Sequence, residues 1–522
     1  MKNMAQQIQD SLRKRYGYKL GANLAGYAIG LVTAGIIPRG LGPKAYGDFS
    51  FLTNFFSQVV SFFDMGSSTA FYIKLSQRQR EVPLVRFYGL YMMVVGIIVL
   101  FLVSLATGCS LQGKLWPEQR IVFIYLSVLW ALLNWTGLIL NQMTDGYGLT
   151  VSAEVNKLWQ KIVSVGIIAG LYAAGWITLG TFFAYQFVLQ TMMVGFLLWI
   201  ILKNGIMHDW NMGISRTQIK SYVREFSEYC HPLAVYSMVC LLTGLFDRWI
   251  LQKMGGSVEQ GFYGFAYQIG ALCFLFTGAM TPLFMREFSI AAGAKDREKM
   301  IALFRRYVPF LYAVTAFFAC FVAVQADRVI AILGGKHFHM ALLPVVILAF
   351  YPLHQTYGQL SGSVFLATGQ TKLYRNIGIV SMVAGLPLVF FLVATQRYAG
   401  FGLGAVGLAI KMVGIQLLIV NIQLYYNAQY LGLNFMKYVF HQIGCILCLL
   451  CVGAGARFLG DAMFRSFAIG GFLAAGCLYS LFVFFLFTKK PIIFGVSQSD
   501  AVLLMQLIRR MGRTSVDQGV LP

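Results

Sequence analysis

Fourteen long apolar runs constrain this chain more than any other feature. Each run is near 20 residues long, from the first at 20–38 to the last at 466–488, and about 20 residues of α-helix cross the hydrocarbon core of a bilayer. The runs are continuous, whereas membrane β-strands would give short alternating segments. Apolar residues make up 58% of the chain and charged residues 11%, which a soluble globule cannot accommodate. The sequence therefore predicts an all-α integral membrane protein with about 14 transmembrane helices.

The basic residues predict how these helices are oriented. The formal net charge is +22, but Lys and Arg gather in short segments between apolar runs, so no basic folded domain exists to bind nucleic acid. If the N-terminus is cytoplasmic, 28 of the 41 basic residues fall on the cytoplasmic side and 10 on the other side. The remaining three, Lys161, Arg248 and Lys411, fall within spans. Because cytoplasmic loops carry an excess of Lys and Arg, we expect both termini in the cytoplasm.

The spacing of the runs predicts two six-helix lobes and two further helices. In chain order we expect an N-terminal lobe at 1–202, a cytoplasmic linker at 203–228 and a second lobe at 229–425. Two additional transmembrane helices at 426–488 and a cytoplasmic tail at 489–522 follow. Within the tail we expect an amphipathic helix at 499–511 that lies on the membrane surface. An internal repeat supports the two lobes: Tyr46-Gly47 and Tyr263-Gly264 each follow a Gly-rich turn and precede an aromatic-rich span. Such paired bundles are typical of alternating-access transporters, whose binding sites lie between the repeats.

Polar residues inside the predicted spans indicate a water-filled central cavity. In the second predicted span (49–73) they recur every three or four residues and so share one helix face: Asn54, Ser57, Ser61, Asp64 and Ser68. Other spans contribute Asn141, Lys161, Asp247, Arg248, His354, Tyr357 and Lys411. Ionisable groups within a membrane are costly and usually face a cavity or a partner. The alternative is that these groups hold helices together, and for Asp247 and Arg248 that they neutralise one another.

Several segments resemble polysaccharide flippases, the O-antigen and capsule translocases of the multidrug/oligosaccharidyl-lipid/polysaccharide (MOP) superfamily. Residues 36–76 are similar to that family's opening, a span, a Leu-Gly-Pro-x-x-Tyr-Gly turn and an aromatic span ending in Asp-x-Gly, here at Leu41, Gly42, Pro43, Tyr46, Gly47, Asp64 and Gly66. FDRWILQKMGG (246–256) resembles the Asp-Arg start of the family's second lobe, and 365–380 and 398–410 resemble its later Gly-rich segments. The chain departs from the family before span twelve, where VATQRYAGFGLG replaces an Ile-Pro and a short Gly turn.

The resemblance implies that the chain flips a polyprenyl-pyrophosphate-linked oligosaccharide across the bacterial cytoplasmic (inner) membrane for surface polysaccharide synthesis. We expect no catalytic residue, metal or cofactor. The candidate pyrophosphate contacts are Lys161, Arg248 and Lys411; the candidate polar residues of the cavity are Asn54, Ser61, Asn141, His354 and Tyr357; and the candidate sites for a coupling H⁺ or Na⁺ are Asp64 and Asp247. The expected partners are the lipid-linked substrate and membrane lipids, with a polysaccharide polymerase as a further candidate.

Three alternatives remain open from the sequence. A lipid II flippase and a drug or cation antiporter of the same superfamily share the architecture, although an antiporter would favour an acidic cavity. A membrane glycosyltransferase or polymerase would need an active site in a long outer loop, and no predicted outer loop exceeds about 15 residues.

Overall fold

The computed structural model describes residues 12–78, 81–205, 214–464 and 468–498, and this part is helical without strands. Ten of its helices are long and apolar enough to cross a membrane. Of the other four predicted spans, 20–38 lies within α2 (Leu12–Asp64) and 155–175 largely coincides with α7 (Thr150–Ala173). The predicted span 49–73 is broken after Asp64 at the end of α2, and 262–285 is broken at 273–274, just before α10 (Leu275–Gly293). The structure confirms the all-α membrane fold. The amphipathic helix predicted at 499–511 lies outside the described residues.

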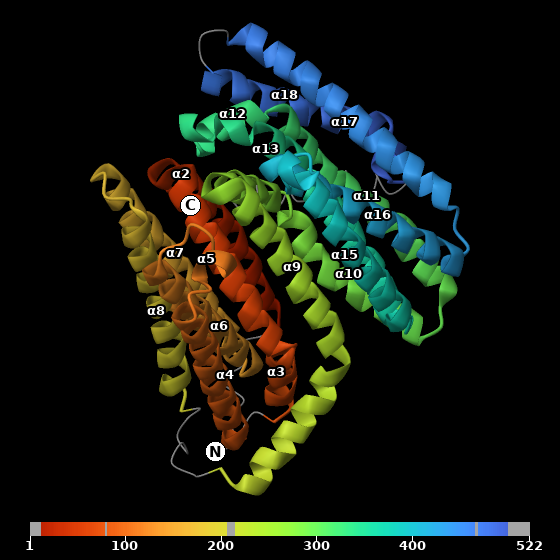
Figure 1. The fold of residues 1–522 in the computed structure, drawn as a ribbon. Coiled ribbons are helices and arrows are strands. Elements are labelled where there is room, and N and C mark those ends of the chain that lie inside the picture. Colours follow the sequence, from red (N-terminus) through yellow and green to blue (C-terminus); the bar gives the residue numbers. More distant parts are fainter. Residues whose placement is uncertain (1–11, 79–80, 206–213, 465–467, 499–522) are drawn as a thin grey trace, which may run out of the picture. The chain divides into compact units, whose positions relative to one another are not determined.

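The chain divides into two compact units (Figure 1). The first unit comprises residues 1–264 with 333–337 and 389–404. Besides α2 and α7 it contains α3 (Ser67–Gln77), α4 (Val82–Gly108), α5 (Gln112–Leu115), α6 (Ile121–Gly146), α8 (Leu179–Lys203) and most of α9 (Arg216–Leu272). Its core is a cluster of apolar side chains from α2, α3, α4 and α6 that includes Phe51, Phe56, Tyr88 and Trp135.

The second unit comprises residues 265–332, 338–388 and 405–522. Besides α10 it contains α11 (Arg297–Val324), α12 (Ala326–Leu333), α13 (Leu342–Leu348), α14 (Tyr351–Ala367), most of α15 (Thr371–Val393), α16 (Gly404–Leu431), α17 (Phe435–Met463) and α18 (Ala468–Lys489). A short 3₁₀ turn at Pro491–Phe494 and most of another at Lys336–Ala341 also belong to it, whereas the 3₁₀ turn at Gln396–Tyr398 belongs to the first unit. The last two long helices, α17 and α18, pack side by side (Figure 1). The lobe boundaries expected from the sequence stay a prediction.

Two matching breaks correspond to the internal repeat of the sequence. The long helices α2 and α9 are each interrupted at one glycine, Gly42 with φ 70° and Gly256 with φ 74°. Glycine adopts positive φ without the steric cost that a Cβ brings. Just beyond the breaks the two backbones pack closely, since a Cβ on Gly47 would clash with the Ser257 carbonyl and a Cβ on Gly261 with that of Pro43. The backbone turns therefore account for the glycines at 42 and 256, and close backbone packing accounts for those at 47 and 261.

Candidate functional site

Asp64 lies at the end of α2, where the chain turns sharply into α3. Met65 and Gly66 both have positive φ, 42° and 83°. The Asp64 carboxylate accepts hydrogen bonds from the backbone N–H of Ser68 at 3.0 Å, from Ser68 Oγ at 2.8 Å and from Ser67 Oγ at 3.1 Å. These donors belong to the first turn of α3, where N–H groups have no partner inside the helix. Asp64 thus stabilises the junction between α2 and α3.

Two further donors reach Asp64 from more distant helices. Tyr88 Oη of α4 lies 3.2 Å from Asp64 Oδ1, and Trp135 Nε1 of α6 lies 3.3 Å from the same oxygen. Hydrogen bonds to a carboxylate are stronger than those between neutral groups. The predicted ion-coupling residue therefore connects α2, α3, α4 and α6 through one side chain.

A small cavity adjoins Asp64 in the first unit. Its volume is about 190 Å³, and it is lined by residues of the α2–α3 junction, α4 and the start of α9: Phe63, Asp64, Met65, Ser67, Phe87, Tyr91, Val223, Phe226, Ser227 and Cys230. This volume is room for several water molecules, each of which occupies about 30 Å³ in the liquid. Asp64 is thus next to a space of water-sized dimensions whose lining is mainly apolar.

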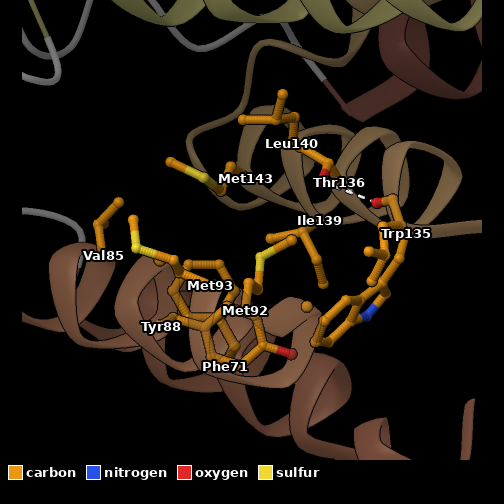
Figure 2. A pocket seen from close by; sticks show the side chains of 13 residues that line it. Phe71, Val85, Tyr88, Met92, Met93, Trp135, Thr136, Ile139, Leu140 and Met143 are labelled. Carbon is orange, nitrogen blue, oxygen red and sulfur yellow. Dashed lines mark hydrogen bonds between the residues drawn. The ribbon is translucent and has the colours of Figure 1, made fainter. Parts of the chain in front are cut away.

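A larger, mainly apolar cavity of about 420 Å³ lies between α3, α4 and α6 (Figure 2). Met92, Met93 and Met143 line it together with Tyr88 and Trp135 (Figure 2). The hydroxyl of Thr136, also in its wall, donates to the backbone carbonyl of Leu132 at 2.9 Å. Because Tyr88 and Trp135 also donate to Asp64, the wall of this cavity is coupled to the hydrogen bonds around Asp64.

Arg248 is buried in the first segment of α9, with 9% of its surface exposed. Its Nη1 donates to Oε1 of Gln260 at 3.1 Å, and its guanidinium lies over the ring of Tyr263, 4.5 Å from the centroid. Both of these partners are uncharged. Asp247, the neighbouring candidate, is also buried in the first unit.

The two candidate lysines each lie against a glycine of a neighbouring helix. A Cβ on Gly26 of α2 would clash with the ammonium of Lys161 from α7. A Cβ on Gly385 of α15 would lie 2.8 Å from Cε of Lys411 from α16. Lys161 is half-buried and Lys411 is buried. Lys161 and Arg248 belong to the first unit and Lys411 to the second.

The uncharged candidates of the first unit occupy three different environments. Asn54 accepts a hydrogen bond from Gln58 Nε2 at 2.8 Å, one turn later on α2. Ser61 is exposed on α2. The Oδ1 atom of Asn141 on α6 is buried and has no hydrogen-bond partner among the described residues. The polar stripe of span two therefore divides, with Asp64 in a buried network and Ser61 on an open surface.

His354 and Tyr357 lie inside the second unit. His354 is 5% exposed and Tyr357 is fully buried. The ring of Tyr312 on α11 lies 4.9 Å from that of Tyr357 and 6.5 Å from that of His354. These two residues therefore face the core of the unit, and the half-buried face of α14 carries Tyr351, Gln355 and Gln359 instead. The spacing of those three residues, four apart, was a signal available in the sequence.

A charged cluster at the predicted cytoplasmic end was also missed. Glu225, in the part of α9 that precedes its apolar segment, accepts hydrogen bonds from Lys74 of α3 and from Arg78 Nη2, the latter at 2.7 Å. Burial alone would raise the pKa of the Glu225 carboxyl, but these two cations hold its pKa below the usual range. Nothing in the local sequence pairs Lys74 with Glu225, which lies 151 residues later.

Comparison with known proteins gives one family and several similar folds. Residues 12–286 match the model of a family described as polysaccharide biosynthesis protein. No curated protein matches the chain. Among solved structures, the fold is similar to that of the lipid II flippase MurJ in an inward closed conformation, with a TM-score of 0.61 and 13% identity over 91% of this chain and 99% of that one.

A second solved structure extends the comparison. It is a multidrug resistance MATE family transporter of the MOP superfamily in an inward-facing conformation, with a TM-score of 0.52 and 14% identity over 82% of this chain and 97% of that one. Both matches span nearly the full length of the solved proteins. The fold is therefore that of membrane transporters of this superfamily.

Proposed function

Because the chain belongs to the polysaccharide biosynthesis protein family, we propose that it flips a polyprenyl-pyrophosphate-linked oligosaccharide from the inner to the outer leaflet of a bacterial cytoplasmic membrane. The lobes would alternate between inward and outward access, and both chain ends would lie in the cytoplasm. The head group of such a lipid carries a charged pyrophosphate, which cannot cross hydrocarbon unaided because losing its hydration costs many kcal/mol. A protein that moves it must offer cations within the membrane.

The observation that carries this proposal is that Arg248 is buried and that the two partners described above are uncharged. An Arg buried in a membrane helix is expensive unless its charge is compensated. Here the guanidinium is held by Gln260 and Tyr263, neither of which carries charge. A guanidinium has five N–H donors, and its planar fork matches the geometry of phosphate oxygens. Arg248 is therefore proposed as the principal pyrophosphate contact.

The other candidates have supporting roles in this proposal. Lys161 and Lys411 would each add a point charge for the phosphates. Asp64, beside a cavity of about 190 Å³, and Asp247 would take the coupling H⁺ or Na⁺. No bond in the substrate needs to form or break for the lipid to change leaflet, so the proposal requires no catalytic group.

Flipping in proteoliposomes tests the proposal directly. An NBD-labelled polyprenyl-pyrophosphate disaccharide that crosses the bilayer becomes quenchable by external dithionite. We expect wild-type protein to flip this lipid and Arg248→Gln to lose most of that activity. Lys253→Gln is the matched control, because Lys253 is an exposed cation on the same helix.

Two outcomes would reject the proposal. A protein that flips lipid II but not the labelled disaccharide lipid is a lipid II flippase. A protein that flips neither lipid but extrudes a cationic dye against a proton gradient is a drug antiporter.

A further inference from the structure

Each unit contains the same small arrangement of an aromatic ring, two amides and a glycine. In the second unit, Tyr351, Gln355 and Gly358 follow one another on one face of α14 at spacings of four and three residues. Gln416 of α16 donates from Nε2 to Oε1 of Gln355 at 2.8 Å. All four residues are half-buried, so part of each is accessible.

The first unit repeats this arrangement on α6 and α8. Trp130, Asn134 and Gly137 have the same spacings on α6, and Gln190 of α8 donates from Nε2 to Oδ1 of Asn134, also at 2.8 Å. Trp130, Asn134 and Gln190 are half-buried as well. The helices α6 and α8 correspond to the fourth and sixth predicted spans (121–141 and 178–202), and α14 and α16 to the tenth and twelfth (341–366 and 401–425). We name these two sets the amide–aromatic motifs.

The glycine has the same neighbours in both motifs. A Cβ on Gly358 would lie 3.1 Å from Nε2 of Gln416 and 3.2 Å from Val420, four residues later on α16. A Cβ on Gly137 would lie 3.9 Å from Oε1 of Gln190 and 3.8 Å from Val194, four residues later on α8. In the second unit the missing Cβ leaves room for Gln416, whereas a Cβ on Gly137 would make only ordinary van der Waals contact with Gln190.

The aromatic residue also has an aromatic neighbour in each motif. The Trp130 ring lies 6.0 Å from Phe49, at an interplanar angle of 70°. The Tyr351 ring lies 5.7 Å from Tyr267, at 43°. The correspondence therefore extends over two helices and to a second aromatic side chain on a third helix, which a chance pair of amides would not give.

These accessible amides are unsuited to lipid. A side-chain amide has two N–H donors and a carbonyl with two acceptor sites, and the one bond within each pair leaves most of this capacity unused. Polar groups left unsatisfied in hydrocarbon cost free energy. The accessible face of each motif must therefore meet a polar medium or a polar ligand.

The chemical groups of the motifs indicate which class of polar ligand they can bind. Neither motif contains a charged residue, so neither offers the cation that a phosphate requires. Amides can donate to one hydroxyl and accept from the next, and an aromatic ring can cover the C–H face of a sugar while staying compatible with water. Uncharged, hydroxyl-rich sugar rings meet all of these requirements.

We propose that each amide–aromatic motif, Trp130–Asn134–Gln190 in the first unit and Tyr351–Gln355–Gln416 in the second, is a subsite that binds a sugar of the substrate head group. This rests on the proposed function, because the sugars arrive attached to the pyrophosphate lipid. The motifs supply specificity for the glycan, and the cations supply affinity for the phosphates.

Binding of matched lipids to the full-length purified protein separates these two contributions. The probes are farnesyl pyrophosphate and the same lipid bearing glucose, galactose or N-acetylglucosamine. We expect at least one sugar-bearing probe to bind more tightly to wild-type protein than the bare pyrophosphate. Because a single sugar occupies one subsite at a time, at least one of the variants Asn134→Leu and Gln355→Met should reduce that preference about tenfold, while the affinity for bare farnesyl pyrophosphate stays unchanged.

A buried amide pair elsewhere in the second unit provides a control for the loss of a helix–helix hydrogen bond. Gln442 of α17 donates from Nε2 to Oδ1 of Asn421 on α16 at 3.1 Å, and Gln442 is 4% exposed. We expect Gln442→Met to keep the wild-type preference for the sugar-bearing probe. Equal loss in this variant would mean that the amides only hold helices together, as polar residues often do in membranes, and would overturn the proposal.

The remaining outcomes are also decisive. Unchanged preference in both Asn134→Leu and Gln355→Met, or no preference in wild-type protein for any of the three sugars, rejects the subsites and leaves the proposed function standing. Failure of wild-type protein to bind any of the pyrophosphate lipids rejects the proposed function, and the subsites with it.

Discussion

The guanidinium of Arg248 donates to the side-chain carbonyl of Gln260, which lies twelve residues later on the same helix, at 3.1 Å. This contact crosses the break at Gly256, where α9 changes direction. The Gln260 amide is itself fully buried and donates back to the backbone carbonyl of Arg248. The two bonds hold the Arg248 side chain in place while leaving its charge uncompensated by either partner.

Removing the charge of Arg248 should weaken the binding of a pyrophosphate lipid. A hydrogen bond to a charged group contributes roughly 1.5–3 kcal/mol, so we expect Arg248→Gln to raise the Kd for farnesyl pyrophosphate about ten- to a hundredfold. Arg248→Lys should recover only part of this loss, because an ammonium lacks the planar fork. Microscale thermophoresis on detergent-purified protein measures these affinities.

A double variant that also removes the charge of the neighbouring Asp247 is the control for this prediction. If Arg248 serves only to neutralise Asp247, the double variant Asp247→Asn/Arg248→Gln should flip lipid as well as wild-type protein does. We expect the double variant to stay inactive. An active, well-expressed double variant would move the phosphate role to Lys161 and Lys411.

The hydrogen bonds around Asp64 predict a graded series of stabilities. Trp135→Phe removes one of the donors and should lower the free energy of unfolding by about 0.5–1.5 kcal/mol. Asp64→Asn should lower it further, since an amide NH₂ would replace one carboxylate oxygen among several donors. Thermal unfolding of the purified variants, followed by circular dichroism, gives the order of the melting temperatures.

A transport assay distinguishes a structural role of Asp64 from a role in ion coupling. We expect Trp135→Phe to keep flipping that depends on an H⁺ or Na⁺ gradient, and Asp64→Asn to lose that dependence. Gradient-driven flipping by Asp64→Asn at the wild-type rate would leave Asp64 with a purely structural role at the helix junction.

The ion pairs of Glu225 predict a pH-dependent contribution to stability. The pKa of this carboxyl is lowered in the folded protein, so the unfolded chain binds the proton more readily. The stabilisation is therefore complete above the unfolded pKa of about 4.3 and disappears as the pH falls through the lower folded value. Because Glu225 is 25% exposed and Arg78 is 44% exposed, we expect the contribution to be at most about 1 kcal/mol.

A pair of variants measures this contribution. Glu225→Gln should lower the melting temperature at pH 7 and have a smaller effect near pH 4. Glu228→Gln is the matched control, since Glu228 pairs with Arg224 on an exposed surface, with 66% and 83% of the two side chains accessible. Equal effects of both variants at pH 7 would show that the cluster with Lys74 and Arg78 adds nothing specific.

The sequence predicted the helices well because their signals are local. Long apolar runs define spans, and Gly42 and Gly256 mark breaks whose positive φ a residue with a Cβ would disfavour at those positions. The polar stripe through Asp64 was also predictable from the spacing of its residues. The partners of Asp64 were not, because Tyr88 and Trp135 reach it from helices whose packing no local pattern records.

The sequence also did not show which of the two polar faces of α14 points into the core. His354 and Tyr357 alternate along the chain with Gln355 and Gln359, so the sequence offers both faces as candidates. Only the position of Tyr312 on α11 shows that His354 and Tyr357 point into the core. The repeat of Trp130–Asn134–Gly137 in Tyr351–Gln355–Gly358 was present in the sequence, but its meaning depends on the hydrogen bonds from Gln190 and Gln416.

The orientation of the protein in its membrane can be tested by cysteine labelling. In a background from which the nine native cysteines are removed, single cysteines at Gln112 and His337 should react with an impermeant maleimide in intact cells, because both positions lie in predicted outer segments. Cysteines at Ser215 and Asp296, in predicted cytoplasmic segments, should react only after the cells are opened. The excess of basic residues on one side supports this orientation. The reverse labelling pattern would place Glu225, Lys74 and Arg78 outside the cell, and would invert the direction of flipping proposed here.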